Sequence, residues 1–307
     1  MIGHGLAASV NLKMSKMLIA LDGSSSSEKV IPTAAALAER CSYDVTLLSV
    51  WEVAEGAAEW GDERVTSLSQ RGLDYLVTYL NRVRADLKRL GLSARVEARA
   101  GHAAVQIIAA AQDLGADMIA MCTHGRRSVP EGRRGSVADK VLRGAAVPVL
   151  AVGPLVREAE PGKPVRFQRI LVPLDGSVEA EEALPVAANL ADGLGAQIQL
   201  LRVVTPALGS YGSELSEAYD HGLDDQRMKV AKDYLRATAK RGSVEAVQAH
   251  LGFPRDAVKD FVERAQIDLV VMTSHSRYAA GLWTLGGVAD ALLDGPAPVV
   301  LLRPSTA

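Results

Sequence analysis

Short runs of apolar residues alternate along the chain with longer stretches in which apolar positions recur at helical spacing. In the first half, residues 17–21, 45–50, 117–122 and 147–152 show no regular polar alternation. Such runs are typical of strands that are buried on both faces of a parallel sheet. Residues 94–100 do alternate between apolar and polar positions, which predicts a strand at the outer edge of that sheet.

Four stretches between these strands have the pattern of helices, at residues 24–40, 64–90, 103–114 and 137–144. Serines open the first stretch as N-cap residues do, and Gly91 follows the second as a C-cap. Strand and helix therefore alternate up to a fifth strand, and right-handed crossovers place helices on both faces of the sheet. Ligands on such folds bind at the carboxyl ends of the strands, where the strand order reverses.

The second half of the chain repeats the first. MLIALDGS at residues 17–24 matches ILVPLDGS at residues 170–177, and four further pairs of segments follow in the same order. These pairs are 45–50 with 198–203, 115–125 with 266–276, 134–142 with 285–293, and 147–152 with 297–302. A period of this length excludes a solenoid and indicates a duplicated domain.

We therefore expect two tandem α/β domains, each a doubly wound, five-stranded parallel sheet flanked by helices. The first domain is predicted to span residues 17–153 and the second residues 169–304. Residues 154–168 are charged and rich in Pro and Gly, as linkers are. Residues 1–16 form an N-terminal extension in this interpretation, with Met14 as an alternative start.

Composition and charge argue against several classes of partner. The 307 residues carry a net charge of −2, which gives no reason to expect a nucleic acid. No apolar run approaches the roughly 20 residues that span a bilayer, so no membrane partner is expected. Cys41 and Cys122 lack CxxC spacing, and a disulfide framework is not expected. A cytoplasmic protein fits these observations best.

A candidate phosphate-binding loop follows the fourth predicted strand. Gly125 is followed by nine residues and then by Gly135 and Ser136, which open a predicted helix. A glycine at this place lets the backbone approach a ligand and adopt positive φ. Free amides of Gly135, Ser136 and Val137 at a helix N-terminus suit phosphate oxygens. Arginines add positive charge to the loop: Arg126, Arg127, Arg133 and Arg134.

Two interpretations of this loop remain open from the residues alone. A Gly-Ser pair before a helix is commonly an N-cap, and arginines on a loop are commonly solvated. The position of the loop after the fourth strand, at the expected reversal of strand order, favours phosphate binding.

At these residues the chain resembles the universal stress protein family in its tandem-domain form, with an adenine nucleotide alpha hydrolase-like fold. The ATP-binding members carry Gly, two residues, Gly, nine residues, and then Gly-Ser or Gly-Thr. They also carry an Asp that ends the first strand and an apolar residue that ends the second. The first half matches at Asp22, Val50, Gly125, Gly135 and Ser136, while Cys122 stands where the first Gly is expected.

The resemblance implies ATP as the ligand, with Mg²⁺ as a further candidate, and assigns roles to residues of the first half. Asp22 and Val50 would flank the adenosine, beside Ala20 and Leu21, and Gly101 would line the same cleft. Gly125, Gly135, Ser136 and Val137 would hold the phosphates, and the further candidate contacts to the nucleotide are Met121, Cys122, Arg126 and Arg127. A non-Gly residue at Cys122 either costs about 1 kcal/mol, if the backbone there needs positive φ, or crowds the nucleotide.

The second half matches the same pattern less well. Thr273, Ser276 and Gly287 replace the first Gly, the second Gly and the Ser. The residues that survive are Asp175, Val203, Gly252 and Gly286. Its loop has one arginine where the first half has four. This half is expected to bind ATP more weakly, to bind another ligand, or to bind none.

Other candidate chemistry is weaker. His124 and His275 occupy equivalent positions without neighbouring ligands at metal spacing, so a metal site is not expected. Cys122 could be a redox sensor, but a buried and inert thiol is the better interpretation. Glu131 and Asp139 form no catalytic pair, although they could bind Mg²⁺ through ATP.

The favoured hypothesis is a cytosolic stress-response protein that binds ATP in its first domain and acts as a sensor or regulator. A non-nucleotide interaction scaffold and a slow ATP hydrolase are the alternatives. By the same resemblance the two halves should pack as a pseudo-two-fold pair through residues 147–152 and 298–302. The intact chain would then form a homodimer or a larger homo-oligomer.

Overall fold

The structure is a computed structural model of the chain, and it describes residues 14–52, 62–125, 134–157, 165–207, 214–241, 244–274 and 285–305. At residues 62–67 and 214–221 only the backbone is described. Within these ranges no helix is both long and apolar enough to cross a bilayer.

The first half follows the predicted alternation of strand and helix. Its strands are β1 (Lys16–Ala20), β2 (Asp44–Trp51), β3 (Ala94–Ala100), β4 (Met118–Cys122) and β5 (Val149–Val152). Its helices are α1 (Ser25–Glu28), α2 (Val30–Cys41), α3 (Asp62–Arg89), α4 (Ala103–Asp113) and α5 (Ser136–Gly144).

The second half repeats this order. Its strands are β6 (Arg169–Pro173), β7 (Gln197–Val204), β8 (Val244–Leu251), β9 (Leu269–Thr273) and β10 (Val299–Leu302). Its helices are α6 (Val178–Glu181), α7 (Ala183–Leu194), α8 (Glu214–Ala239), α9 (Pro254–Arg264) and α10 (Gly287–Leu293).

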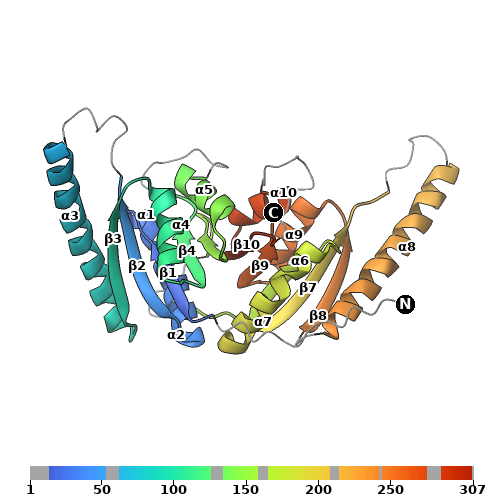
Figure 1. Cartoon of the computed structure of the whole chain (residues 1–307). Coiled ribbons are helices and arrows are strands. Elements are labelled where there is room, and N and C mark those ends of the chain that lie inside the picture. Colours follow the sequence, from blue (N-terminus) through green and yellow to red (C-terminus); the bar gives the residue numbers. More distant parts are fainter. Residues whose placement is uncertain are drawn as a thin grey trace.

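The strands of both halves join into one ten-stranded sheet with the order β3-β2-β1-β4-β5-β10-β9-β6-β7-β8 (Figure 1). Within each half all pairings are parallel, which confirms the predicted doubly wound fold. The halves meet through an antiparallel pairing of β5 with β10, in which Leu150 lies opposite Val300. The predicted contact between the last strands is therefore confirmed.

One predicted helix is divided in two. The sequence pattern predicted a single helix over residues 24–40, but α1 ends at Glu28 and α2 begins at Val30. Pro32 explains the division, because a proline lacks the N–H that would bond the carbonyl of Glu28 and its ring clashes with that carbonyl. In the second half, Pro185 has the same relation to Glu181, where α6 ends.

Each face of the sheet has one hydrophobic core that continues across both halves. One core packs the sheet against α2, α3, α7 and α8, with Leu37, Leu80, Leu190 and Leu235 fully buried. The other packs it against α4, α5, α9 and α10. Neighbouring residues of β1 pack into different cores: Leu18 and Ile19 are each 0% exposed and face opposite sides of the sheet. Burial on both faces explains why the strand sequences are apolar throughout.

Candidate functional site

Strands β1 and β4 lie next to each other where the order of the strands reverses. From β1 the chain continues outward through β2 and β3, whereas β4 leads inward to β5. Ile19 of β1 is in register with Ala120 of β4, so the two strands end at the same edge of the sheet. Open α/β sheets bind ligands at this point. The residues that follow β1 and β4 form the candidate site.

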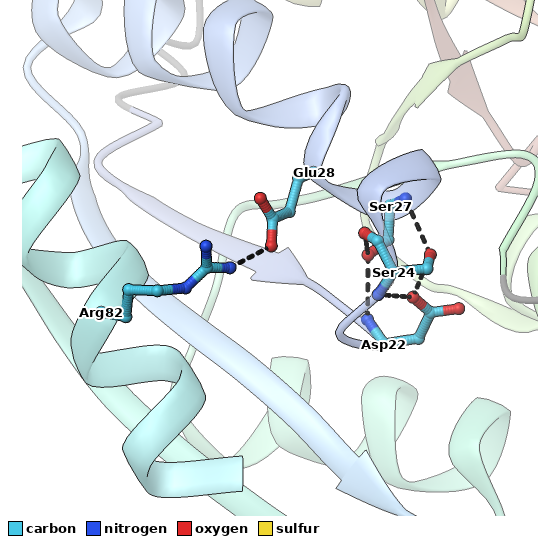
Figure 2. A network of polar contacts seen from close by, with 5 residues as sticks. All are labelled: Asp22, Ser24, Ser27, Glu28 and Arg82. Carbon is cyan, nitrogen blue, oxygen red and sulfur yellow. Dashed lines mark hydrogen bonds and ion pairs between the residues drawn. The ribbon is translucent and has the colours of Figure 1, made fainter.

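Asp22 follows β1 and holds together the turn that leads into α1 (Figure 2). Its Oδ1 atom accepts hydrogen bonds from the backbone N–H of Ser24 at 2.9 Å and from the Ser24 hydroxyl at 2.6 Å. The Ser24 Oγ atom accepts the N–H of Ser27 at 3.1 Å and so caps α1. The Asp22 N–H donates to Ser27 Oγ at 3.3 Å. These bonds fix the carboxylate at the carboxyl end of β1.

The far end of α1 is tied to a different helix. Glu28, its last residue, forms an ion pair with Arg82 of α3 (Figure 2). Both side chains are partly exposed, so the pair adds little stability but limits the position of α1. The short helix beside the site is thereby held at both ends.

Gly125, in the loop that follows β4, lies against the carboxylate of Asp22, which follows β1. A Cβ atom on Gly125 would lie 2.5 Å from Asp22 Oδ2, which is closer than such atoms approach. The expectation of positive φ at Gly125 is wrong, because its φ lies outside the left-handed region. This position therefore needs glycine for space, and the loops after β1 and β4 come together here.

Helix α5 begins beside the same loop. Gly135 is its N-cap, and the Gly135 N–H donates to the carbonyl of Thr123 at 2.9 Å. Because Gly135 has no side chain, the N-cap residue leaves the amides of the first turn without a side-chain cap. Ser136 is exposed and Val137 is half-buried against the core. An anion at this helix end would be favoured by the amides and the helix dipole.

The other predicted residues of the first half divide between the two faces of the sheet. Ala20, Val50 and Met121 face the core beneath α4 and α5, whereas Leu21 packs in the core beneath α2. Gly101 follows β3 with φ +132°, a backbone conformation that favours glycine. Its N–H donates to the carbonyl of Trp51. Arg126 and Arg127 lie outside the described residues.

Cys122 ends β4, and its side chain packs in the core beneath α2. Its side chain is 8% exposed, and its Sγ atom lies 3.5 Å from the carbonyl oxygen of Ser27. Burial raises the pKa of the Cys122 thiol to about 12, so it stays protonated at neutral pH. Its backbone is an extended strand without positive φ, so the expected conformational cost of a non-Gly residue is absent.

The second half keeps the aspartate turn but changes the loop. Asp175 Oδ1 accepts the N–H and hydroxyl of Ser177 at 2.9 and 2.6 Å, as in the first half. At the other strand the Gly286 N–H donates to the Ser274 side chain at 3.0 Å, instead of to a backbone carbonyl. Helix α10 has only seven residues, and its first residue, Gly287, is exposed.

The remaining predicted residues of this half keep their places in the fold. Val203 is half-buried in β7, and the Gly252 N–H donates to the carbonyl of Val204, as that of Gly101 does to Trp51. His275 and Ser276 lie outside the described residues. His124, the equivalent of His275, shares a hydrogen bond with the Thr123 hydroxyl at 2.9 Å between Oγ1 and Nδ1.

The family model of the universal stress proteins matches the chain twice, at residues 14–153 and at residues 166–303. The chain belongs to the universal stress protein family. The two matches account for the repeat in the sequence and for the two joined halves of the sheet.

Individual proteins, two of them universal stress proteins, resemble the chain in sequence or in fold. One from Methanocaldococcus jannaschii is 28% identical over 140 residues, which cover 45% of this chain and 82% of that protein. The structure of one from Archaeoglobus fulgidus has a TM-score of 0.67 at 21% identity and covers 94% of this chain and 98% of its own. A Pseudomonas aeruginosa protein described as functionally unknown has a TM-score of 0.65 at 16% identity, with 97% and 96% covered. The joined arrangement of two halves is therefore a shared fold.

Two features of this universal stress protein site were missed from the sequence. The first is the bonding of Asp22 to Ser24, for which the signal was the DGS triplet present in both halves. The second is Arg134, which was counted with the positive loop. Its Nη2 atom instead lies 2.5 Å from Oδ1 of Asp290, which belongs to the second half.

Proposed function

We propose that this universal stress protein binds ATP in its first half, between the ends of β1 and β4, and acts as a regulator that reports the presence of nucleotide. The observation that carries the proposal is the contact of Gly125 with Asp22 beside the start of α5. It brings a fixed carboxylate, a glycine without side-chain bulk and a helix N-terminus together where strand order reverses.

The first-half residues divide into an adenosine side and a phosphate side. Asp22 and Val50, with Ala20 and Leu21 beside them, would contact the adenosine, and the Gly101 turn would close the cleft. The phosphates would bind the backbone amides of Gly135, Ser136 and Val137, with Gly125 allowing close approach. The Gly125 and Gly135 α-carbons fit this role, because a Cβ on either would press on Asp22 or on the Thr123 carbonyl.

Regulation fits the described residues better than catalysis. Cys122 is buried with a raised pKa, which removes it as a nucleophile, and the Asp22 carboxylate is bonded into its turn. We therefore expect hydrolysis of ATP to be slow or absent, and any Mg²⁺ to arrive on the phosphates. Bound nucleotide would stabilise the folded state and bias the surface offered to a partner. A cytoplasmic homodimer is the setting we propose.

The second half is proposed to bind ATP more weakly or not at all. Its aspartate turn is intact, but α10 is shorter than α5 and the Ser274 hydroxyl accepts the Gly286 N–H. The loop between them also has fewer arginines than that of the first half. Weaker positive charge and a shorter helix both lower the affinity for phosphate.

Equilibrium dialysis with labelled ATP tests the proposal. We expect one ATP per chain, and an affinity reduced about tenfold or more by Gly135→Val, since the added side chain presses on the Thr123 carbonyl at the phosphate site. Gly286→Val is the matched control at the equivalent position and should leave this affinity unchanged. Failure of the unmodified chain to bind ATP would refute the proposal, and so would equal losses in both variants.

A further inference from the structure

An ion pair crosses from the candidate site to the other half of the molecule. The Nη2 atom of Arg134 lies 2.5 Å from Oδ1 of Asp290 and 4.0 Å from Oδ1 of Asp139. The Arg134 side chain is 11% exposed, and that of Asp290 is 40% exposed. Arg134 directly precedes Gly135, the N-cap of α5, whereas Asp290 lies in the first turn of α10. The pair therefore joins the start of the proposed phosphate helix to the second half.

The position of this pair in the fold makes it a link between the two halves. Helices α5 and α10 lie close to each other over the β5–β10 junction (Figure 1). The strands beneath them are joined by backbone hydrogen bonds, so that junction is a rigid base. Any movement of the first turn of α5 must then change the distance between Arg134 and Asp290.

Comparison of the two halves shows that only one of the two equivalent ion pairs can form. Arg134 corresponds to Leu285, and Asp290 corresponds to Asp139. The reciprocal pair is missing because Leu285 cannot form an ion pair, and Asp139 bonds Arg143 of its own helix at 2.9 Å. The second half thus supplies a carboxylate to Arg134, and among the described residues the equivalent positions form no return pair. The half whose own loop has fewer arginines therefore contacts the start of α5 in its neighbour.

Two opposing effects decide what Asp290 does to a bound phosphate. Its negative charge repels the anion, but the carboxylate is partly exposed and its charge is screened by solvent. Its loss would leave the guanidinium of Arg134 nearly buried without its nearest partner, which is strongly unfavourable. Arg134 would then turn toward solvent and move Gly135 with it. The second effect is the larger because Arg134 is the more buried of the two.

We propose that Asp290 is a positioning residue for the nucleotide site of the first half. By holding Arg134, the second half keeps the first turn of α5 in the orientation that binds phosphate. This inference rests on the proposed function, and it gives the half with the altered loop a role in regulating its neighbour. Movement of α10 would then change nucleotide affinity across the junction.

A double-mutant cycle measured as ATP affinity tests the inference. We expect Asp290→Asn and Arg134→Leu each to weaken ATP binding about fivefold, and the double variant to be no weaker than either. Leucine is the residue at the equivalent position of the second half, which favours folding of that variant. Asp290→Glu should restore most of the affinity. Asp233→Asn is the control, since it breaks an Asp–Arg pair inside α8 and should change nothing.

Hydrogen exchange without nucleotide separates this inference from the proposed function. Asp290→Asn should speed the exchange of the amides at Gly135 and Asp139, which donate to the carbonyls of Thr123 and Gly135, while Asp233→Asn should not. If the unmodified chain binds ATP but Asp290→Asn changes neither exchange nor affinity, the inference is wrong and the function stands. Tighter binding by Asp290→Asn also overturns it. If the unmodified chain binds no ATP, both the proposed function and this inference fail. Faster exchange in Asp290→Asn would then show only that Asp290 stabilises the start of α5.

Discussion

The Oδ1 atom of Asp22 accepts both the backbone N–H and the hydroxyl of Ser24, at 2.9 and 2.6 Å. Asp175 and Ser177 repeat this geometry with the same distances in the second half. In both halves the serine also caps the following helix, through the N–H of Ser27 or Ala180. One serine therefore fixes both the helix start and the carboxylate that follows the first strand.

Replacement of Ser24 by alanine should separate stability from binding. Ser24→Ala removes an N-cap, which costs about 1 kcal/mol of unfolding free energy. It also removes one of the two hydrogen bonds that Oδ1 of Asp22 accepts, so the carboxylate is held less firmly and ATP affinity should fall. Ser177→Ala makes the same change in the second half and should lower stability equally while leaving ATP affinity unchanged. Urea unfolding and dialysis measure the two effects. Equal losses of affinity in both variants would contradict this account of Asp22.

A methyl group at position 125 should disrupt the site by steric overlap. The added Cβ of Gly125→Ala would lie 2.5 Å from Asp22 Oδ2, so the loop or the carboxylate must move. We expect a loss of about 1–3 kcal/mol of unfolding free energy, as overpacking gives, together with weaker ATP binding. Gly287→Ala, where nothing lies within 4 Å, should be neutral or stabilising. Wild-type affinity in Gly125→Ala would show that the two loops do not need this contact.

The strands could be predicted from the sequence because burial leaves a local signal. Residues such as Leu18 and Ile19 face opposite cores, so both must be apolar. The division of the helix at residues 24–40 also had a local cause, in Pro32. It was missed because the apolar spacing continues on both sides of the break and because proline is tolerated in the first turn of a helix.

The ion-pair partner of Arg134 could not be predicted from such a local signal. A charge count finds four arginines near the loop but cannot tell which carboxylate each will meet. Asp290 is far away along the chain and approaches only because β5 pairs with β10. Gly125 is an intermediate case, since the glycine was identified as important, but for positive φ and for the approach of a ligand instead of for the space that Asp22 occupies.

The thiol of Cys122 should react slowly in the folded protein and faster as pH rises. Burial raises its pKa to about 12, from 9.0, so roughly a thousandth of the usual thiolate is present at pH 8. In Cys41→Ala, which leaves one thiol, an aromatic disulfide reagent should therefore react slowly until denaturant is added. Rapid reaction of the folded variant at pH 8 would contradict the burial of Cys122 and revive its role as a redox sensor.

The same pKa shift predicts how stability depends on pH. The folded state holds the Cys122 proton more tightly than the unfolded state, so the contribution is complete below pH 9. It is lost as the pH rises from about 9 toward 12. The unfolding free energy should accordingly fall more steeply between pH 8 and 10 in the unmodified chain than in Cys122→Ala. Identical slopes would mean that the thiol titrates normally in the folded protein.

Restoring the family's glycine at Cys122 should harm the protein without improving its site. Cys122→Gly removes a buried side chain that lies against the carbonyl of Ser27, and the cavity costs about 1–3 kcal/mol. The extended backbone gains nothing from glycine, and the side chain points into the core beneath α1, so ATP affinity should be unchanged. Ala120→Gly, two residues earlier on the same face of β4, is the control for glycine in this strand. Tighter ATP binding by Cys122→Gly alone would show that the thiol crowds the nucleotide after all.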